Sequence, residues 1–129
     1  MDANRSLSLT ANEDGTVIAT NRHGTQITID QRGLRGLTPL EMLLAALGSC
    51  SAVDLALLMA KQRAPVTPFE IEVDGLKEDL RMQWLRVTYR IDPDVDARKL
   101  ERARVKTAED LCTVSRTLAA GCPVEHVIA

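Results

Sequence analysis

One segment constrains the fold of this chain more than any other. Residues 39–63 form a long apolar stretch in which Asp54 is the only charged residue between Glu41 and the last turn. The stretch begins with a capping box, in which Thr38 is the N-cap, Pro39 takes the first helical position and Glu41 the third. Cations in the last turn and a proline just beyond it predict where the helix ends. The pattern predicts a helix of about 37 Å, at ~1.5 Å per residue.

A helix of this length is too large for one small chain to enclose. A globule of 129 residues has a radius of gyration near ~14 Å, so the helix is about as long as the globule is wide. Gly48, Ser49, Ser51 and Asp54 interrupt the apolar run and argue against a membrane span. We expect one domain over residues 1–129 and an obligate homodimer in which two of these helices pack together.

The segments on either side of this helix alternate apolar and polar residues, which predicts strands. The last two form a hairpin whose outward acidic residues face outward arginines. A helix capped by Asp96 and a second one capped by Thr107 follow. The fold class is therefore α+β, with antiparallel sheets around a long buried central helix. The expected strands are 6–10, 15–20, 25–30, 69–74, 85–91 and a short last one at 123–128; the expected later helices are 96–106 and 107–120.

Composition excludes two classes of partner. Aromatic residues are 2% of the chain, too few for a base-stacking sheet, and sixteen Lys and Arg stand against eighteen Asp and Glu. No basic field attracts a phosphate backbone, so nucleic acid is not an expected partner. The start of the chain does not have the pattern of a secretory signal, so we expect a cytoplasmic protein with reduced cysteines.

Three cysteines remain to be explained. Cys50 lies in the middle of the long helix, with Asp54 one turn further along the same face. A carboxylate raises the pKa of a neighbouring thiol unless a cation intervenes, so we expect Asp54 to be a structural hydrogen-bonding group. Cys112 lies in the first two turns of the helix 107–120, and Cys122 follows Gly121 in an accessible loop without an evident role.

The cysteine spacings do not predict a metal site or a cofactor. The chain has no Cys-x-x-Cys motif, and its two histidines stand in separate segments. A free cysteine in a reducing compartment is most often a small buried apolar residue. A chemical role for Cys50 or Cys112 therefore needs further support.

That support comes from the order of the elements. A meander, a long apolar helix with a central cysteine, a hairpin and a second cysteine in a late helix together resemble the OsmC/Ohr superfamily. The motifs that carry the resemblance are TPLEMLLAALGSC at 38–50 and LCTVS at 111–115. The stretches CSAVD at 50–54 and KQR at 61–63 look most like the smaller, less characterised OsmC-like branch.

The resemblance implies an intertwined α+β homodimer with its sites at the subunit interface. It also implies a thiol peroxidase that reduces organic hydroperoxides, with Cys50 as the peroxidatic and Cys112 as the resolving cysteine. A dithiol, such as a dihydrolipoyl group or thioredoxin, would restore both thiols. The alternative is a non-catalytic OsmC-like dimer that binds a small apolar ligand or senses oxidation.

The sequence departs from the pattern of the peroxidase members at the group that activates the thiol. In those members a Glu directly follows the first proline of the helix and orients an Arg beside the peroxidatic thiol. Leu40 stands at that position here, and the first predicted turn, NEDG at 12–15, carries acids in place of the arginine. Which arginine would serve Cys50 stays open among Arg22, Arg32, Arg35 and none of them.

Overall fold

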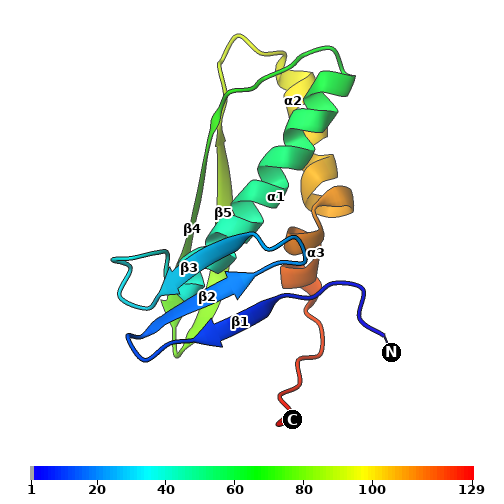
Figure 1. Cartoon of the computed structure of the whole chain (residues 1–129). Coiled ribbons are helices and arrows are strands. Elements are labelled where there is room, and N and C mark those ends of the chain that lie inside the picture. Colours follow the sequence, from blue (N-terminus) through cyan, green and yellow to red (C-terminus); the bar gives the residue numbers. More distant parts are fainter. Residues whose placement is uncertain (1) are drawn as a thin grey trace. The chain divides into compact units, whose positions relative to one another are not determined.

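The computed structural model describes residues 2–129 and has the predicted α+β architecture, with antiparallel sheets and helices (Figure 1). The chain divides into two compact units, Met1–Leu43 and Leu44–Ala129. Helix α1 (Pro39–Lys61) begins in the first unit and continues through the second.

The first unit contains a three-stranded antiparallel meander, as its alternating sequence predicts. Its strands pair in the order β1 (Ser8–Ala11), β2 (Thr16–Thr20) and β3 (Gln26–Asp30). Both hairpin turns contain a glycine with positive φ, Gly15 at 88° and Gly24 at 82°. Only glycine adopts this conformation without a steric penalty, which is why the turns fall at these positions.

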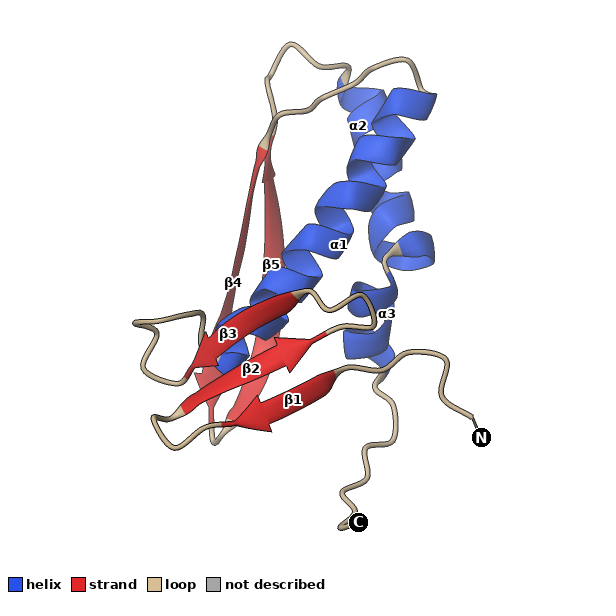
Figure 2. Cartoon of the chain, in the orientation of Figure 1, coloured by secondary structure: helices blue, strands red, loops and turns tan. Residues whose placement is uncertain are grey.

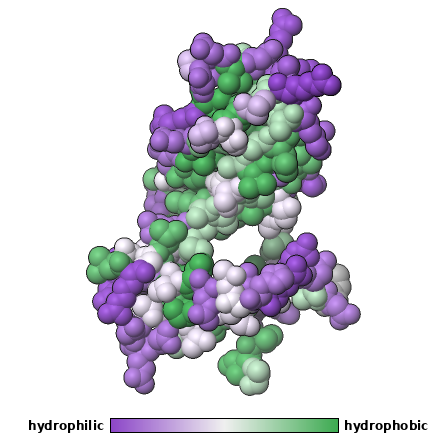
Figure 3. All heavy atoms as spheres, turned by 45° about the horizontal axis from the view of Figure 1, so that its top comes forward, coloured by the Kyte–Doolittle hydropathy of each residue, from purple (hydrophilic) through white to green (hydrophobic). Residues whose placement is uncertain are grey.

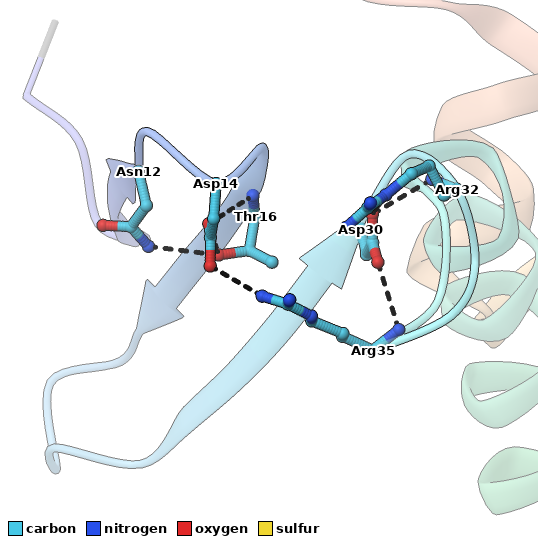
Figure 4. A network of polar contacts seen from close by, with 6 residues as sticks. All are labelled: Asn12, Asp14, Thr16, Asp30, Arg32 and Arg35. Atoms are coloured by element: carbon cyan, nitrogen blue, oxygen red, sulfur yellow. Dashed lines mark hydrogen bonds and ion pairs between the residues drawn. The ribbon is translucent and has the colours of Figure 1, made fainter.

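A network of carboxylates fixes the loop between this meander and helix α1 (Figure 4). The buried Asp30 carboxylate accepts the backbone N–H groups of Arg32 and Arg35, each at 3.1 Å. These hydrogen bonds lower the pKa of Asp30, because they favour its charged form. The Arg35 guanidinium in turn donates to Asp14 at 2.8 Å.

The predicted capping box starts α1 at the end of this loop. The Thr38 backbone N–H donates to Glu41 Oε1 at 2.9 Å, and the Glu41 backbone N–H donates to Thr38 Oγ1 at 3.1 Å. Each side chain thus satisfies a backbone donor that the helix leaves free.

The second unit places a hairpin and two further helices around the rest of α1 (Figure 2). Strands β4 (Glu70–Glu78) and β5 (Arg81–Arg90) pair antiparallel, and their outward charges meet as predicted. Arg86 pairs with Asp74 at 2.6 Å and Arg90 with Glu72 at 2.7 Å. These pairs are exposed, so they specify register more than they stabilise the fold.

Helix α1 buries one face within this chain. Leu55 and Met59 of α1 form the core of the second unit with Ala103, which belongs to helix α2 (Ala97–Lys106). On another face Val53 and Leu57 are 59% and 57% exposed. Figure 3 shows apolar side chains gathered on one face of the molecule. By length and composition α1 could cross a membrane, but its place in the core identifies it as a core helix.

The region after α2 differs from the prediction of one helix over 107–120. A π-helical turn, η1 (Thr107–Leu111), follows α2 directly, and α3 (Thr113–Ala120) is a separate helix. Between them Cys112 is extended, with φ −67° and ψ 104°, and it is Cys112 rather than Thr107 that caps the last helix. Cys112 can take the N-cap position because its sulfur, like a side-chain oxygen, accepts the backbone N–H of Ser115, three residues further along the chain.

The end of the chain also differs from the sequence prediction. Asp96 and Gly121 cap α2 and α3 as expected. The strand predicted over 123–128 was wrong for this chain by itself, because the described tail is not paired with any strand. Its apolar side chains remain in solvent: Val124, Val127 and Ile128 are all exposed.

We expect Gly48 and Val73 to be energetically coupled. A Cβ added at Gly48 would lie 2.9 Å from Val73 Cγ2. Overpacking in Gly48→Ala should therefore lower the free energy of unfolding by about 1–3 kcal/mol. The higher helix propensity of alanine opposes this loss by ~1 kcal/mol. Val73→Ala removes the clash, and the coupling in a double-mutant cycle should be about 1 kcal/mol. Urea unfolding of the four proteins measures it. If the effects of the two substitutions on the free energy of unfolding are strictly additive, contact with Val73 does not restrict the size of the side chain at position 48.

Candidate active site: two thiols and a carboxylate

The structure brings together two of the three cysteines. The Sγ atoms of Cys50 in α1 and Cys112 before α3 lie with a carboxylate oxygen of Asp54 in a cluster whose members are all within 4.8 Å of one another. Both thiols are free. A disulfide needs its sulfurs ~2.0 Å apart, so a bond between these two requires only a local displacement. Cys122 is exposed and lies outside the cluster.

Cys112 is held by groups from two elements. Its side chain is fully buried, at 0% exposure. The Ser115 backbone N–H at the start of α3 donates to Cys112 Sγ at 3.4 Å, and the Ser51 hydroxyl of α1 lies 3.6 Å from the same sulfur. The sulfur is therefore fixed in position and direction, toward α1 and the Cys50 side chain.

Cys50 lies in an environment that disfavours its thiolate. Burial raises the pKa of the Cys50 thiol above its ordinary value, and the nearby Cys112 and Asp54 raise it further. The Val114 backbone N–H hydrogen-bonds the sulfur and opposes this effect in part. Cys50 is consequently a protonated thiol at neutral pH, which is what the sequence predicts for a thiol beside Asp54 without a cation.

The structural hydrogen-bonding role expected of Asp54 stays a prediction. In residues 2–129 its carboxylate takes part in none of the ion pairs of the chain. Cys50, Asp54 and Cys112 together form a set of donors that could hold an ion. The sequence did not reveal this set because Cys112 comes from a distant segment and joins the other two only in the fold.

A small cavity beside Cys112 contains residues that the sequence analysis missed. Its volume is about 190 Å³, and both serine neighbours of the Cys112 sulfur line it. Burial raises the pKa of the Tyr89 phenol, and a hydrogen bond with Ser51 partly opposes this rise. Tyr89 could have been found, because the only tyrosine of the chain stands on the apolar face of a predicted strand. The lining residues are Ser51, Val87, Tyr89, Arg104, Ala108 and Ser115.

The three candidate activating arginines all belong to the first unit, where each interacts with another side chain. Arg35 pairs with Asp14 at 2.8 Å and Arg32 with Asp30 at 3.3 Å. Arg22 donates to the neighbouring histidine ring at 3.2 Å. In the second unit Arg104 reaches the cavity beside Cys112, and its guanidinium also donates to Glu101 at 2.8 Å.

With this geometry in view, comparison with known proteins identifies the family. A family model described as OsmC-like protein matches residues 30–127. The chain belongs to the OsmC-like protein family. Among curated relatives, Protein YhfA of Escherichia coli (strain K12) is 30% identical over 119 residues, covering 86% of this chain and 87% of the relative.

Solved structures confirm the OsmC-like fold. A hypothetical protein from Aquifex aeolicus VF5 is 26% identical, with a TM-score of 0.78 over 94% of this chain and 90% of that one. An OsmC-like protein from Mycoplasma pneumoniae is 18% identical, with a TM-score of 0.80 over 94% and 91% of the two chains. The organic hydroperoxide resistance protein OhrB of Bacillus subtilis is 19% identical, with a TM-score of 0.60 over 92% and 94%. The resemblance drawn from the two sequence motifs is thereby confirmed at the level of the superfamily.

We expect Asp54→Asn to make Cys50 more reactive. The amide removes a negative charge that raises the Cys50 pKa, so the thiolate fraction at neutral pH increases and alkylation accelerates. The rate of Cys50 alkylation by iodoacetamide, followed by peptide mass analysis from pH 6 to pH 10, measures the change.

In this titration the midpoint of the rate for the native chain should lie above that of a simple thiol, and the midpoint of Asp54→Asn should lie below that of the native chain. Asp110→Asn changes an exposed carboxylate on η1 outside the cluster and is the matched control. Equal profiles for the native chain and Asp54→Asn would contradict the role assigned to the carboxylate.

Proposed function

We propose that this protein is a thiol peroxidase that reduces organic hydroperoxides, with Cys50 as the peroxidatic and Cys112 as the resolving cysteine. The observation that carries the proposal is the proximity of the two sulfurs, which come from separate segments and lie within 4.8 Å as free thiols. Membership of the OsmC-like family and the fold shared with OhrB support it.

The proposed reaction has three steps. The Cys50 thiolate attacks the terminal peroxide oxygen, the O–O bond breaks, and the alcohol leaves with a proton while Cys50 becomes a sulfenic acid. The Cys112 sulfur then attacks the Cys50 sulfur, which forms a disulfide and releases water. A dithiol reductant of the lipoyl or thioredoxin type reduces that disulfide by exchange and carries away both oxidising equivalents.

The surroundings of the two sulfurs suit the second step. Attack on a sulfenic sulfur requires the resolving sulfur to point at it, and Ser115 and Ser51 fix the direction of Cys112. Tyr89 and Ser51 both line the cavity beside it, and the interaction with Ser51 lowers the otherwise raised pKa of the Tyr89 phenol. The raised pKa of Cys50 disfavours the thiolate that the first step requires.

We further propose that the working form is a cytoplasmic homodimer in which each chain acts as a single OsmC-like domain. The family match over residues 30–127 spans both compact units and supports one domain. Exposed residues on α1 recur at helical spacing, and together with the exposed apolar tail they offer a surface that a second copy would cover. These residues of α1 are Ala46, Ser49, Val53, Leu57 and Ala60. We assign neither nucleic acid nor membrane as a partner.

One observation favours the alternative, a non-catalytic dimer that senses oxidation or binds a small ligand. The raised pKa of Cys50 leaves little thiolate at neutral pH, and a thiol that reacts slowly is suited to reporting oxidation rather than to rapid turnover. The rate of peroxide consumption separates the two functions.

We expect the reduced protein to consume cumene hydroperoxide much faster than free cysteine does, and faster than it consumes hydrogen peroxide. Stopped-flow measurement with a dithiol reductant gives the rates. Cys50→Ser should reduce consumption to the background rate, because it removes the nucleophile. Cys112→Ser should allow the first turnover but accumulate the Cys50 sulfenic acid, which a dimedone label detects.

Cys122→Ser is the matched control and should behave as the native protein, because this thiol lies outside the cluster. Non-reducing mass analysis of the oxidised protein should show a bond between Cys50 and Cys112. A native protein no faster than free cysteine would refute the peroxidase function, and a bond between Cys112 and Cys122 would refute the assigned roles.

We expect Leu57→Glu to weaken the dimer. Leu57 is one of the exposed residues of α1, and a glutamate there would place a charge in an apolar interface. The dissociation constant should rise at least about tenfold, the ratio that corresponds to ~1.4 kcal/mol. Sedimentation at low micromolar concentration measures it. Leu80→Glu, in the β4–β5 turn and 92% exposed, should have no effect; a stable native monomer would exclude the dimer.

A further inference from the structure

Beyond the peroxide chemistry, we propose that Cys50, Asp54 and Cys112 form a binding site for one zinc ion per chain. Nothing in the peroxidase reaction employs Asp54. The three donors nevertheless converge, with all their ligand atoms within 4.8 Å of one another. The inference uses the same sulfurs as the proposed function but does not depend on it.

The spacing of these donors is close to what one ion requires. Zinc binds thiolate sulfur at about 2.3 Å and carboxylate oxygen at about 2.0–2.2 Å, so tetrahedral ligands lie roughly 3.5–4 Å apart. Donor atoms within 4.8 Å reach that arrangement through small side-chain rotations. Cys50 and Asp54 are four positions apart on one face of α1, the spacing by which a helix presents two ligands to the same ion.

The third ligand is oriented before any ion binds. The Ser115 backbone N–H and the Ser51 hydroxyl both contact the Cys112 sulfur, and such outer contacts fix the direction of a metal ligand. Cys112 is buried, whereas Cys50 and Asp54 are partly exposed, so an ion would enter from their side. This access leaves the fourth coordination position to water.

The chemistry of the donors selects the class of ion. Two thiolates favour zinc over magnesium or calcium, which prefer oxygen ligands alone. Binding replaces a proton on each thiol, so Zn²⁺, two thiols and one carboxylate give the complex and two protons pass to the buffer. The positive ion also balances the carboxylate, which takes part in no ion pair among residues 2–129. Because both sulfurs are then ligands, the zinc form is inactive toward peroxide until the ion leaves.

Calorimetric titration of the full-length, reduced and metal-free protein with Zn²⁺ tests the site. Titration in two buffers of different ionisation enthalpy gives the stoichiometry, the affinity and the number of protons released. We expect one ion per chain and two protons. Substitution of Co²⁺ for Zn²⁺ should give the thiolate-to-cobalt charge-transfer bands of a tetrahedral site.

Variants identify the ligands. Cys50→Ser and Cys112→Ser should each abolish the charge-transfer bands or halve them with a large loss of affinity, and Asp54→Asn should weaken binding by about tenfold or more. Cys122→Ser and Asp110→Asn, a thiol and a carboxylate outside the cluster, should bind as the native protein does. Far-ultraviolet circular dichroism verifies folding, and Asp54→Asn, which is isosteric, remains informative if a cysteine variant does not fold.

The proposal is refuted if the native protein binds no zinc, if Asp54→Asn binds as tightly as the native chain, or if binding follows Cys122. Its fate is separate from that of the peroxidase function. Zinc binding by a protein without peroxidase activity would support this site and refute the enzyme, while an active peroxidase that does not bind zinc would do the reverse.

Discussion

Burial of one face of helix α1 is the constraint on which the rest of the structure depends. The buried residues recur every three or four positions and pack against the hairpin and α2, so the rotation of the helix about its axis is fixed. Cys50 directly precedes the buried Ser51 and therefore lies at the border of this face, half-buried. The same rotation turns Asp54 toward the thiol and leaves Val53 outside. The buried positions are Leu47, Gly48, Ser51, Leu55 and Met59.

The cluster then combines groups whose chemical preferences conflict. A nucleophilic thiolate is favoured by donors and cations, yet burial and a carboxylate surround Cys50. At Cys112 the Ser115 backbone N–H at the start of α3 donates to the sulfur, and the Ser51 hydroxyl lies 3.6 Å from it. The two thiols are thus chemically distinct, and the difference comes from the break between η1 and α3, which turns Cys112 into a cap.

Local interactions explain what could be predicted from the sequence. The capping box at Thr38, the glycine turns of the meander and the facing charges of β4 and β5 all depend on residues close in sequence or in register. The cap at Cys112 could not be predicted, because a π-helical turn follows α2 directly and shifts the start of the last helix. Tyr89 and Arg104 join the site only through tertiary structure. The tail at 123–128 has a strand-like sequence without a strand to pair with in its own chain.

One atom of Cys112 serves both the architecture and the chemistry. Its sulfur closes the first turn of α3, an eight-residue helix too short to persist without its cap. In a disulfide the orientation of the sulfur is set by the bond to its partner, so the sulfur is a poorer acceptor for the Ser115 backbone N–H. In the proposed disulfide form the first turn of α3 would therefore lose this cap. The oxidation state of the buried Cys112 sulfur would in this way affect the stability of the exposed helix α3.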